Sequence, residues 1–174
     1  MPEHAIVDSV RDKILETMER TDHLVSMAPV GRLAWRPEVP ESQIAAMDLG
    51  HLLGHLLSCV AGFGAALHAA FPAELSELEE LKSLTVDHFC TPDETRKRIK
   101  VYSRHIAKGL GHCAEADLGR RIRTVFVPEG ETLLTLLMGN LEHLTNHKYQ
   151  LFFYLRLLGV GAGTADLYRL RGES

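Results

Sequence analysis

The sequence predicts an all-α protein, a four-helix bundle with long crossover connections, and three observations support this prediction. Apolar residues recur at helical spacing along four long segments of the chain. Two of the intervening stretches are longer than the short turns of an up-and-down bundle. With 174 residues and 45% hydrophobic content, the chain can bury a sizeable core. The expected helices cover residues 3–27, 48–70, 91–116 and 132–158.

We find no internal repeat and no low-complexity segment, so we expect residues 1–174 to form a single domain. The formal net charge is −4 and basic residues are not clustered, which argues against nucleic acid as a partner. The N-terminus is polar, and no apolar run reaches the roughly 18 residues of a membrane span. Three widely spaced cysteines without a CxxC pair predict neither disulfides nor a thiolate zinc site. We therefore expect a cytoplasmic protein without a membrane segment.

The first expected helix has an apolar stripe with charged residues between its members, and Pro29 and Gly31 should end it. Residues 32–43 contain further prolines and no clear period, so we expect an ordered loop there. Trp35 is the only tryptophan, and we expect it to fill the core beneath that loop rather than to act chemically.

The second expected helix begins after Asp48, a good N-cap residue, and ends near Ala70. It carries many glycines for a helix, although each costs about 1 kcal/mol relative to alanine in a helix interior. Two explanations stay open: close packing of a neighbouring segment, or access for a ligand near His55. The glycines are Gly50, Gly54, Gly62 and Gly64.

A long crossover follows, in which residues 74–82 predict a short acidic surface helix. Thr91 is the expected N-cap of the third helix, with a proline at the first position and acidic residues in the first turn. This helix should continue to Ala116. Residues 121–126 alternate and are partly β-branched, which predicts a short strand or extended segment before the last helix.

The fourth expected helix starts near Thr132 and stops at Gly159, a typical glycine after a helix C-terminus. The tail, residues 161–174, should pack loosely or fray.

Two histidines of the fourth helix are the first candidate site residues. His143 and His147 are four positions apart, so their imidazoles share one face of the helix, roughly 6 Å apart along the axis. Two neutral imidazoles placed in this way can share one divalent metal ion. The same face should point into the protein, because it also carries Leu136, Asn140, Gln150 and Tyr154.

The second helix offers a third imidazole, from His51 or His55. His55 lies among leucines, where an unpaired imidazole is costly. Facing His143 and His147, it would complete a three-histidine site with open positions, which is the catalytic rather than the structural pattern. The alternative is that these histidines are core residues bonded to ordinary acceptors. His51 is either a fourth ligand or simply part of the helix cap.

Three further residues are candidates for supporting roles. Gln150 and Asp48 are candidates for residues that lie behind the ligands. A ligating histidine usually needs a partner for its second ring nitrogen, and the sequence does not identify the group that supplies it. The cysteines are more often small buried hydrophobic residues than nucleophiles. Cys59 is the exception to consider, because it lies one helical turn after His55 and can approach the site.

At these positions the chain resembles the DinB/YfiT-like family of metal-binding four-helix bundles. Residues 48–55, DLGHLLGH, are similar to the family's S-(V/I)-G-E-L-L-x-H helix start, with His55 at the ligand position. Residues 143–150, HLTNHKYQ, are similar to H-x-x-x-H-(R/K)-G-Q. The proline-containing loop around Trp35, the extended segment before the last helix and the ending LRLLG at 155–159 also fit.

The sequence departs from the family pattern at three positions. Tyr149 replaces a small glycine, Asn146 stands where many members have another histidine, and His51 replaces the usual glutamate. None of these changes removes His55, His143 or His147, but they alter what fits around them.

The resemblance implies a nickel or zinc ion held by the three histidines, and often a homodimer. It further implies a thiol-dependent transferase or isomerase that joins a low-molecular-weight thiol, such as bacillithiol or mycothiol, to an electrophilic small molecule. Two alternatives stay open beside this enzyme. One is a metal-dependent hydrolase, and the other is a non-catalytic metal-binding or stress-response dimer.

Overall fold

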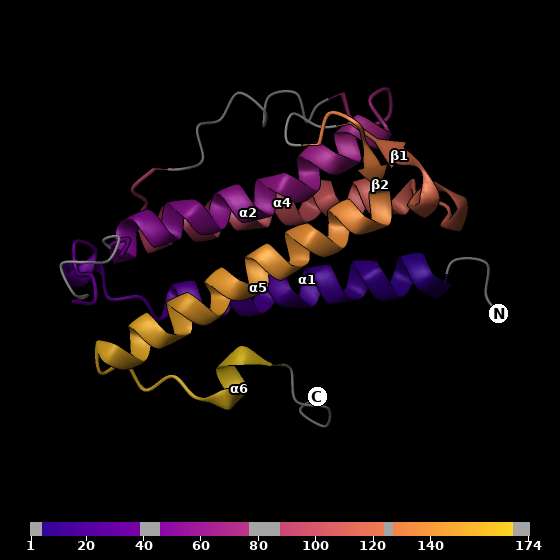
Figure 1. Cartoon of the computed structure of the whole chain (residues 1–174). Helices are drawn as coiled ribbons and strands as arrows, with labels where there is room; N and C mark the ends of the chain where they lie inside the picture. Colours follow the sequence, from indigo (N-terminus) through magenta and orange to yellow (C-terminus); the bar gives the residue numbers. More distant parts are fainter. Residues whose placement is uncertain (1–4, 39–45, 77–87, 124–126, 169–174) are drawn as a thin grey trace.

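A computed structural model of the chain describes residues 5–38, 46–76, 88–123 and 127–168. Four long helices form a bundle, and Figure 1 labels each of them. The helices are α1 (Ala5–Ser26), α2 (Leu49–Ala70), α4 (Pro92–Gly111) and α5 (Leu133–Leu157).

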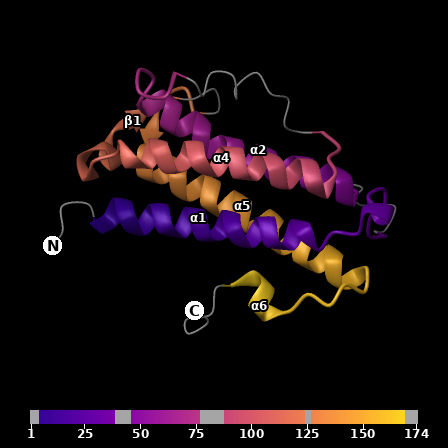
Figure 2. The same ribbon diagram turned by 180° about the vertical axis from the view of Figure 1, so that it is seen from behind.

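Each helix of the bundle packs against two others. α1 contacts α4 and α5, and α2 contacts the same two helices from the opposite corner. The chain therefore crosses the bundle between α1 and α2, and Figure 2 shows the same arrangement from behind. The prediction of an all-α four-helix bundle with crossover connections is confirmed.

Capping side chains begin α2, α4 and α5 where the sequence predicts, and a glycine follows the end of α5. Asp48 accepts a hydrogen bond from the backbone N–H of His51 at 2.8 Å at the start of α2. Thr91 and Thr132 cap α4 and α5 in the same way. Gly159 follows α5 with a φ of +80°, a left-handed conformation that glycine adopts without steric cost.

α4 ends earlier than the sequence predicts, at Gly111 instead of Ala116. The backbone N–H groups of His112 and Cys113 both bond three residues back, at 3.2 Å, which tightens the last turn. Ala114 is then extended, and a separate 3-10 helix, η3, covers Glu115–Gly119.

The extended segment expected before α5 is present at its start. β1 (Arg121–Ile122) pairs antiparallel with β2 (Glu131–Thr132), and residues 124–126 of the predicted segment lie outside the described residues. Most of the short helix predicted over residues 74–82 also lies outside them.

The tail is more ordered than expected up to Tyr168. A short helix, α6 (Thr164–Leu167), packs against α1, and Leu167 is buried. His23 Nε2 lies 2.7 Å from Asp166 Oδ1, and Lys148 Nζ donates to the Leu167 carbonyl at 3.1 Å. The prediction of a loose tail is therefore wrong for α6, because tertiary contacts hold it. Residues 169–174 lie outside the described part.

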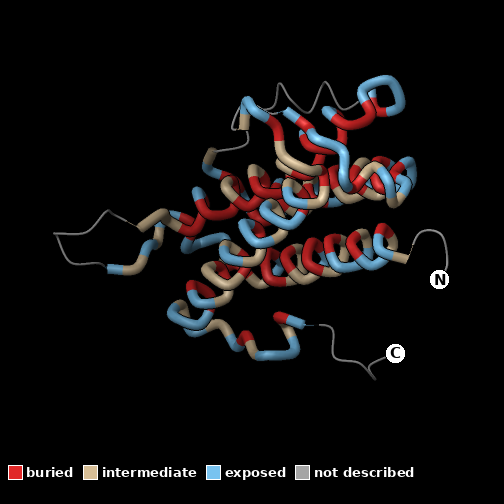
Figure 3. The backbone as a smooth tube through the Cα atoms, turned by 45° about the vertical axis from the view of Figure 1, so that its right-hand side comes forward, coloured by how far each residue is buried: buried red, intermediate tan, exposed pale blue. Residues whose placement is uncertain are grey.

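α2 is the core helix of the bundle. It is long and apolar enough to cross a membrane by length and composition, so the expectation that no segment reaches this length is wrong by that measure. However, 67% of its apolar window is buried inside the protein. Figure 3 shows buried backbone on the inward faces of the helices. Packing within the bundle accounts for the apolar character of α2.

Trp35 is half-buried, as expected of a residue that closes the core beneath a loop. Its ring meets that of Tyr154 edge-on, with 5.4 Å between centroids and 87° between planes. This contact joins the loop before α2 to α5.

Close packing explains three of the four glycines in α2. A Cβ on Gly50 would clash with the ring of Phe89, and one on Gly54 would overlap the carbonyl oxygen of His88. A Cβ on Gly62 would clash with the side chain of Asn140. A Cβ on Gly64 would meet nothing within 4 Å, and nothing in the structure explains that glycine.

We expect Gly54→Ala to destabilise the fold by about 1–3 kcal/mol, the range for overpacking. The added methyl group must displace backbone at His88, because no flexible side chain lies there to move aside. Urea unfolding followed by far-UV circular dichroism measures the change.

Gly64→Ala is the matched control in the same helix. It should stabilise the protein by up to about 1 kcal/mol through helix propensity alone. Equal losses in both variants would show that helix flexibility, and not the contact with His88, requires glycine at position 54.

Candidate metal centre

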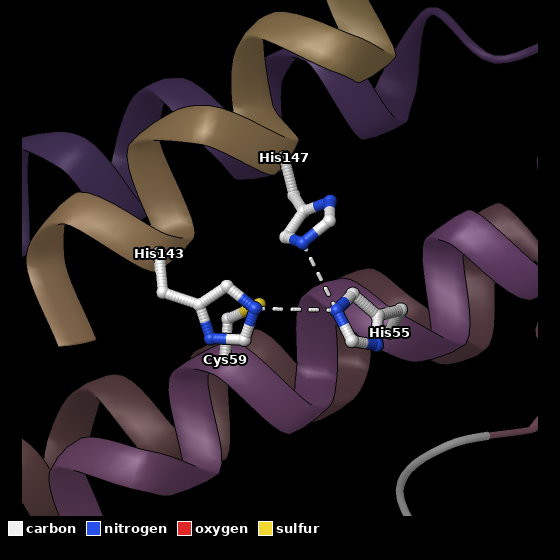
Figure 4. A group of neighbouring side chains, drawn as sticks. All are labelled: His55, Cys59, His143 and His147. Atoms are coloured by element: carbon white, nitrogen blue, oxygen red, sulfur yellow. Dashed lines mark hydrogen bonds between the residues drawn. The ribbon is translucent and has the colours of Figure 1, made fainter. Parts of the chain in front are cut away.

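Three histidine side chains converge between α2 and α5, as Figure 4 shows. His55 comes from α2, while His143 and His147 come from α5. The Nε2 atom of His55 lies 3.0 Å from that of His147 and 3.3 Å from that of His143. The structure thus brings together the three residues that the sequence predicts as metal ligands. Their role as ligands stays a prediction.

The antiparallel contact of α2 with α5 aligns the donors. His55 faces His147, and farther along the same pair of helices Gly62 faces Asn140. The missing side chain at Gly62 lets the amide of Asn140 pack directly on α2. His55 and His147 each lie about two helical turns from this contact on their own helix, so the close approach at Gly62 places the imidazoles within reach of each other.

The distances between the imidazole nitrogens fit a shared cation. Two neutral Nε2 atoms that face each other repel through their lone pairs unless a proton or a metal ion lies between them. Tetrahedral coordination with metal–nitrogen bonds of about 2.0–2.1 Å separates two ligand nitrogens by about 3.4 Å. The separations of 3.0 and 3.3 Å are close to this value.

A chain of hydrogen bonds fixes the ring of His147. Its Nδ1 lies 2.8 Å from Gln150 Oε1, an acceptor, so Nδ1 carries the proton and Nε2 presents a lone pair to the centre. Gln150 Nε2 in turn donates to the Tyr154 hydroxyl at 3.1 Å, and that hydroxyl donates to the Met47 carbonyl at 3.0 Å. The expectation that Gln150 supports a candidate ligand agrees with this geometry.

The surroundings favour the neutral, ligating form of the α5 histidines. Burial lowers the pKa of His143, and the neighbouring His55 lowers it further. Burial also lowers the pKa of His147, against a smaller opposing effect of its bond to Gln150. Neutral imidazole is the form that binds metal ions.

A cysteine sulfur belongs to the same cluster. Cys59 Sγ and one ring nitrogen each from His55, His143 and His147 all lie within 4.8 Å of one another. Cys59 is 1% exposed, whereas His143 is exposed. The cluster is therefore covered on one side by the protein and accessible from the other.

His51 and Asp48 lie apart from this cluster. The Nδ1 atom of His51 is 2.8 Å from both carboxylate oxygens of Asp48, and its ring packs edge-on against Phe89. Asp48 therefore caps α2 and holds His51, so the expectation that it supports a ligand of the three-histidine cluster is not met. The cap contact accounts for His51, which stands outside the four-residue group.

A second, smaller group of potential donors lies at the start of α4. His88 Nε2 is 3.2 Å from Cys90 Sγ and 3.4 Å from Glu94 Oε1. Glu94 also faces Arg98 Nη1 at 3.8 Å, a cation that competes with a metal ion for the carboxylate. The four-donor group between α2 and α5 is therefore the stronger candidate.

The hydrogen-bond chain behind His147 includes two residues to which the sequence reasoning gives no role, Tyr154 and Met47. The four-residue spacing of Gln150 and Tyr154 on one helix face can signal their contact. Met47 contributes only its backbone carbonyl, and no sequence pattern marks such an acceptor.

Comparison with known proteins identifies the fold. No protein-family model matches the sequence, and no curated protein matches it. Among solved structures, the crystal structure of YjoA, a DinB-like protein from Bacillus subtilis, superposes with a TM-score of 0.68. The match covers 92% of this chain and 99% of that chain, at 19% sequence identity. The chain therefore has a DinB-like fold, as its sequence motifs predict.

We expect the metal-free protein to lose stability as the pH falls below about 6.5, the usual pKa of histidine. Because the folded state lowers the pKa of His143 and His147, the unfolded chain binds more protons in this range. Their contribution to stability is complete above the unfolded-state pKa and is lost as the pH falls through the lower folded-state values. Urea unfolding at about pH 7.5 and about pH 5.5, with chelator present, measures the loss.

The double variant His143→Gln/His147→Gln should show a smaller pH dependence than the wild type. His112→Gln is the control, because His112 is exposed and outside the cluster. If the double variant kept the full pH dependence, the titrating groups would lie elsewhere in the protein.

Proposed function

We propose that this chain binds one divalent transition metal ion through His55, His143 and His147. The observation that carries the proposal is the separation of the imidazole nitrogens: His55 Nε2 lies 3.0 Å from His147 Nε2 and 3.3 Å from His143 Nε2. The bond from His147 to Gln150 supports it, because ligating histidines usually hold their second ring nitrogen in this way. Imidazole ligands suit several metals, and we expect nickel or zinc.

We further propose that the protein is a metal-dependent enzyme of the thiol S-transferase or isomerase type. A bound ion with an open position supplies Lewis acidity, which lowers the pKa of a thiol and makes it a nucleophile at neutral pH. The chain positions the imidazoles from two rigid helices and leaves His143 accessible to solvent. The substrates would be a low-molecular-weight thiol and an electrophilic small molecule. None of the three cysteines forms a disulfide bond, which fits a reducing compartment, and we propose the cytoplasm.

We expect protein purified without a histidine tag to contain about one transition metal ion per chain. Three imidazoles are enough to hold one ion, with the fourth position left for water or substrate. His143→Ala/His147→Ala should contain none, because a single remaining imidazole binds metal weakly. Elemental analysis by plasma mass spectrometry, before and after reconstitution, measures the content.

Two single variants complete the design. His51→Ala should retain the metal, because His51 is bonded to Asp48 outside the cluster. His88→Ala should retain it as well, because His88 belongs to the second group. Loss of metal from His88→Ala but not from the double variant would move the site to the start of α4.

We expect the metal-loaded protein to join a thiol such as bacillithiol or mycothiol to an electrophile, and His55→Ala to lower the rate at least about 100-fold. Loss of a ligand removes the ion that activates the thiol. Consumption of free thiol, followed with a chromogenic disulfide reagent, measures the reaction.

Far-UV circular dichroism must show that His55→Ala is folded, and His112→Ala controls for loss of a surface histidine. Undiminished thiol consumption in folded His55→Ala would contradict the proposed reaction. Hydrolysis of an ester or amide without thiol would instead favour the hydrolase, and no turnover despite bound metal would favour a non-catalytic metal protein.

A further inference from the structure

We infer that Cys59 is a fourth ligand of the proposed ion, so that three imidazole nitrogens and one thiolate sulfur surround it. This inference rests on the proposed metal-binding function and specifies the resting state of that same site. It also revises one expectation from the sequence. Because the cysteines form no CxxC pair, the sequence predicts no thiolate ligand.

The position of Cys59 supports this role. It lies four residues after His55, so both side chains project from the same face of α2 toward α5. Its Sγ atom and one nitrogen from each of the three imidazoles all lie within 4.8 Å of one another. In Figure 4, His55 and Cys59 extend from α2 toward His143 and His147 on α5. Two donors from each helix can thus surround a single point.

Burial keeps water away from the Cys59 sulfur and leaves it facing the other potential ligands. Cys59 is 1% exposed and approaches the cluster from the protein side. A thiolate in such a place needs a cation beside it, since burial alone favours the neutral thiol. Cys113, which belongs to no potential metal-ligand group within the described ranges, shows the effect of burial: the pKa of its thiol is raised to about 11.

Four ligands have a consequence for the proposed reaction. With His55, His143, His147 and Cys59 as ligands, a bound ion would have four protein donors, the number of a closed tetrahedral site, and would hold no water. An incoming thiol would take the place of Cys59 as a ligand, with its sulfur–metal bond forming as the bond to Cys59 breaks. The proton of the incoming thiol passes to the sulfur of Cys59, so charge and atoms balance. This exchange favours thiols over water as substrates of the centre.

Cobalt(II) substitution tests the inference, because a cobalt–thiolate bond gives a near-ultraviolet charge-transfer band that imidazole ligands do not give. We expect this band in the wild type and not in Cys59→Ser, which should still bind cobalt, with affinity lowered at least about 10-fold. Metal binding should also release about one more proton per chain from the wild type than from Cys59→Ser, since a thiol ligand must be deprotonated.

Cys113→Ser is the matched control, because Cys113 is also buried, its Sγ donates to the backbone carbonyl of Ala114, and it lies outside the four-residue group. It should keep the band and the proton release. Cys59→Ala serves as a second variant if Cys59→Ser does not fold. A wild type that binds cobalt without the band, or a band that persists in Cys59→Ser, would overturn the inference and leave the three-histidine site intact. A wild type that binds no cobalt would overturn the proposed function itself.

Discussion

The close antiparallel contact between α2 and α5 is the constraint on which the candidate site depends. Neither helix carries enough donors for a metal ion by itself. Gly62 lets Asn140 pack against α2 without an intervening side chain. The helical repeat then places His55 and Cys59 opposite His147 and His143, so the packing of the helices also sets the separation of the potential donors. A wider crossing of these helices would leave the same residues on separate surfaces.

The loop before α2 also contacts α5, through Met47 and Trp35. The carbonyl of Met47 accepts a hydrogen bond from Tyr154, the last in the series of hydrogen bonds that begins at His147. The ring of Trp35 also packs edge-on against that of Tyr154. Asp48 begins α2 immediately after Met47. The start of α2 and the orientation of a candidate ligand therefore depend on one another. Such outer contacts hold an imidazole in the tautomer that a metal ion requires.

Local chemistry made much of the fold predictable. Asp48, Thr91 and Thr132 mark three helix starts because a side-chain oxygen can accept a bond from an otherwise unpaired N–H group. The errors occur where tertiary contacts act. α4 ends at Gly111 in a tightened turn that apolar spacing does not reveal, and α6 forms because Asp166 and Leu167 meet α1 and α5.

The sequence by itself determined the all-α bundle and the caps of its helices, and it predicted His55, His143 and His147 as candidate ligands, since helical spacing and residue chemistry are local properties. Only the tertiary structure decided that Gln150 holds His147 while Asp48 holds His51, and that Cys59 faces the three imidazoles. These choices depend on the rotation and separation of α2 and α5. Contacts between distant segments set both quantities, and no single helix encodes them.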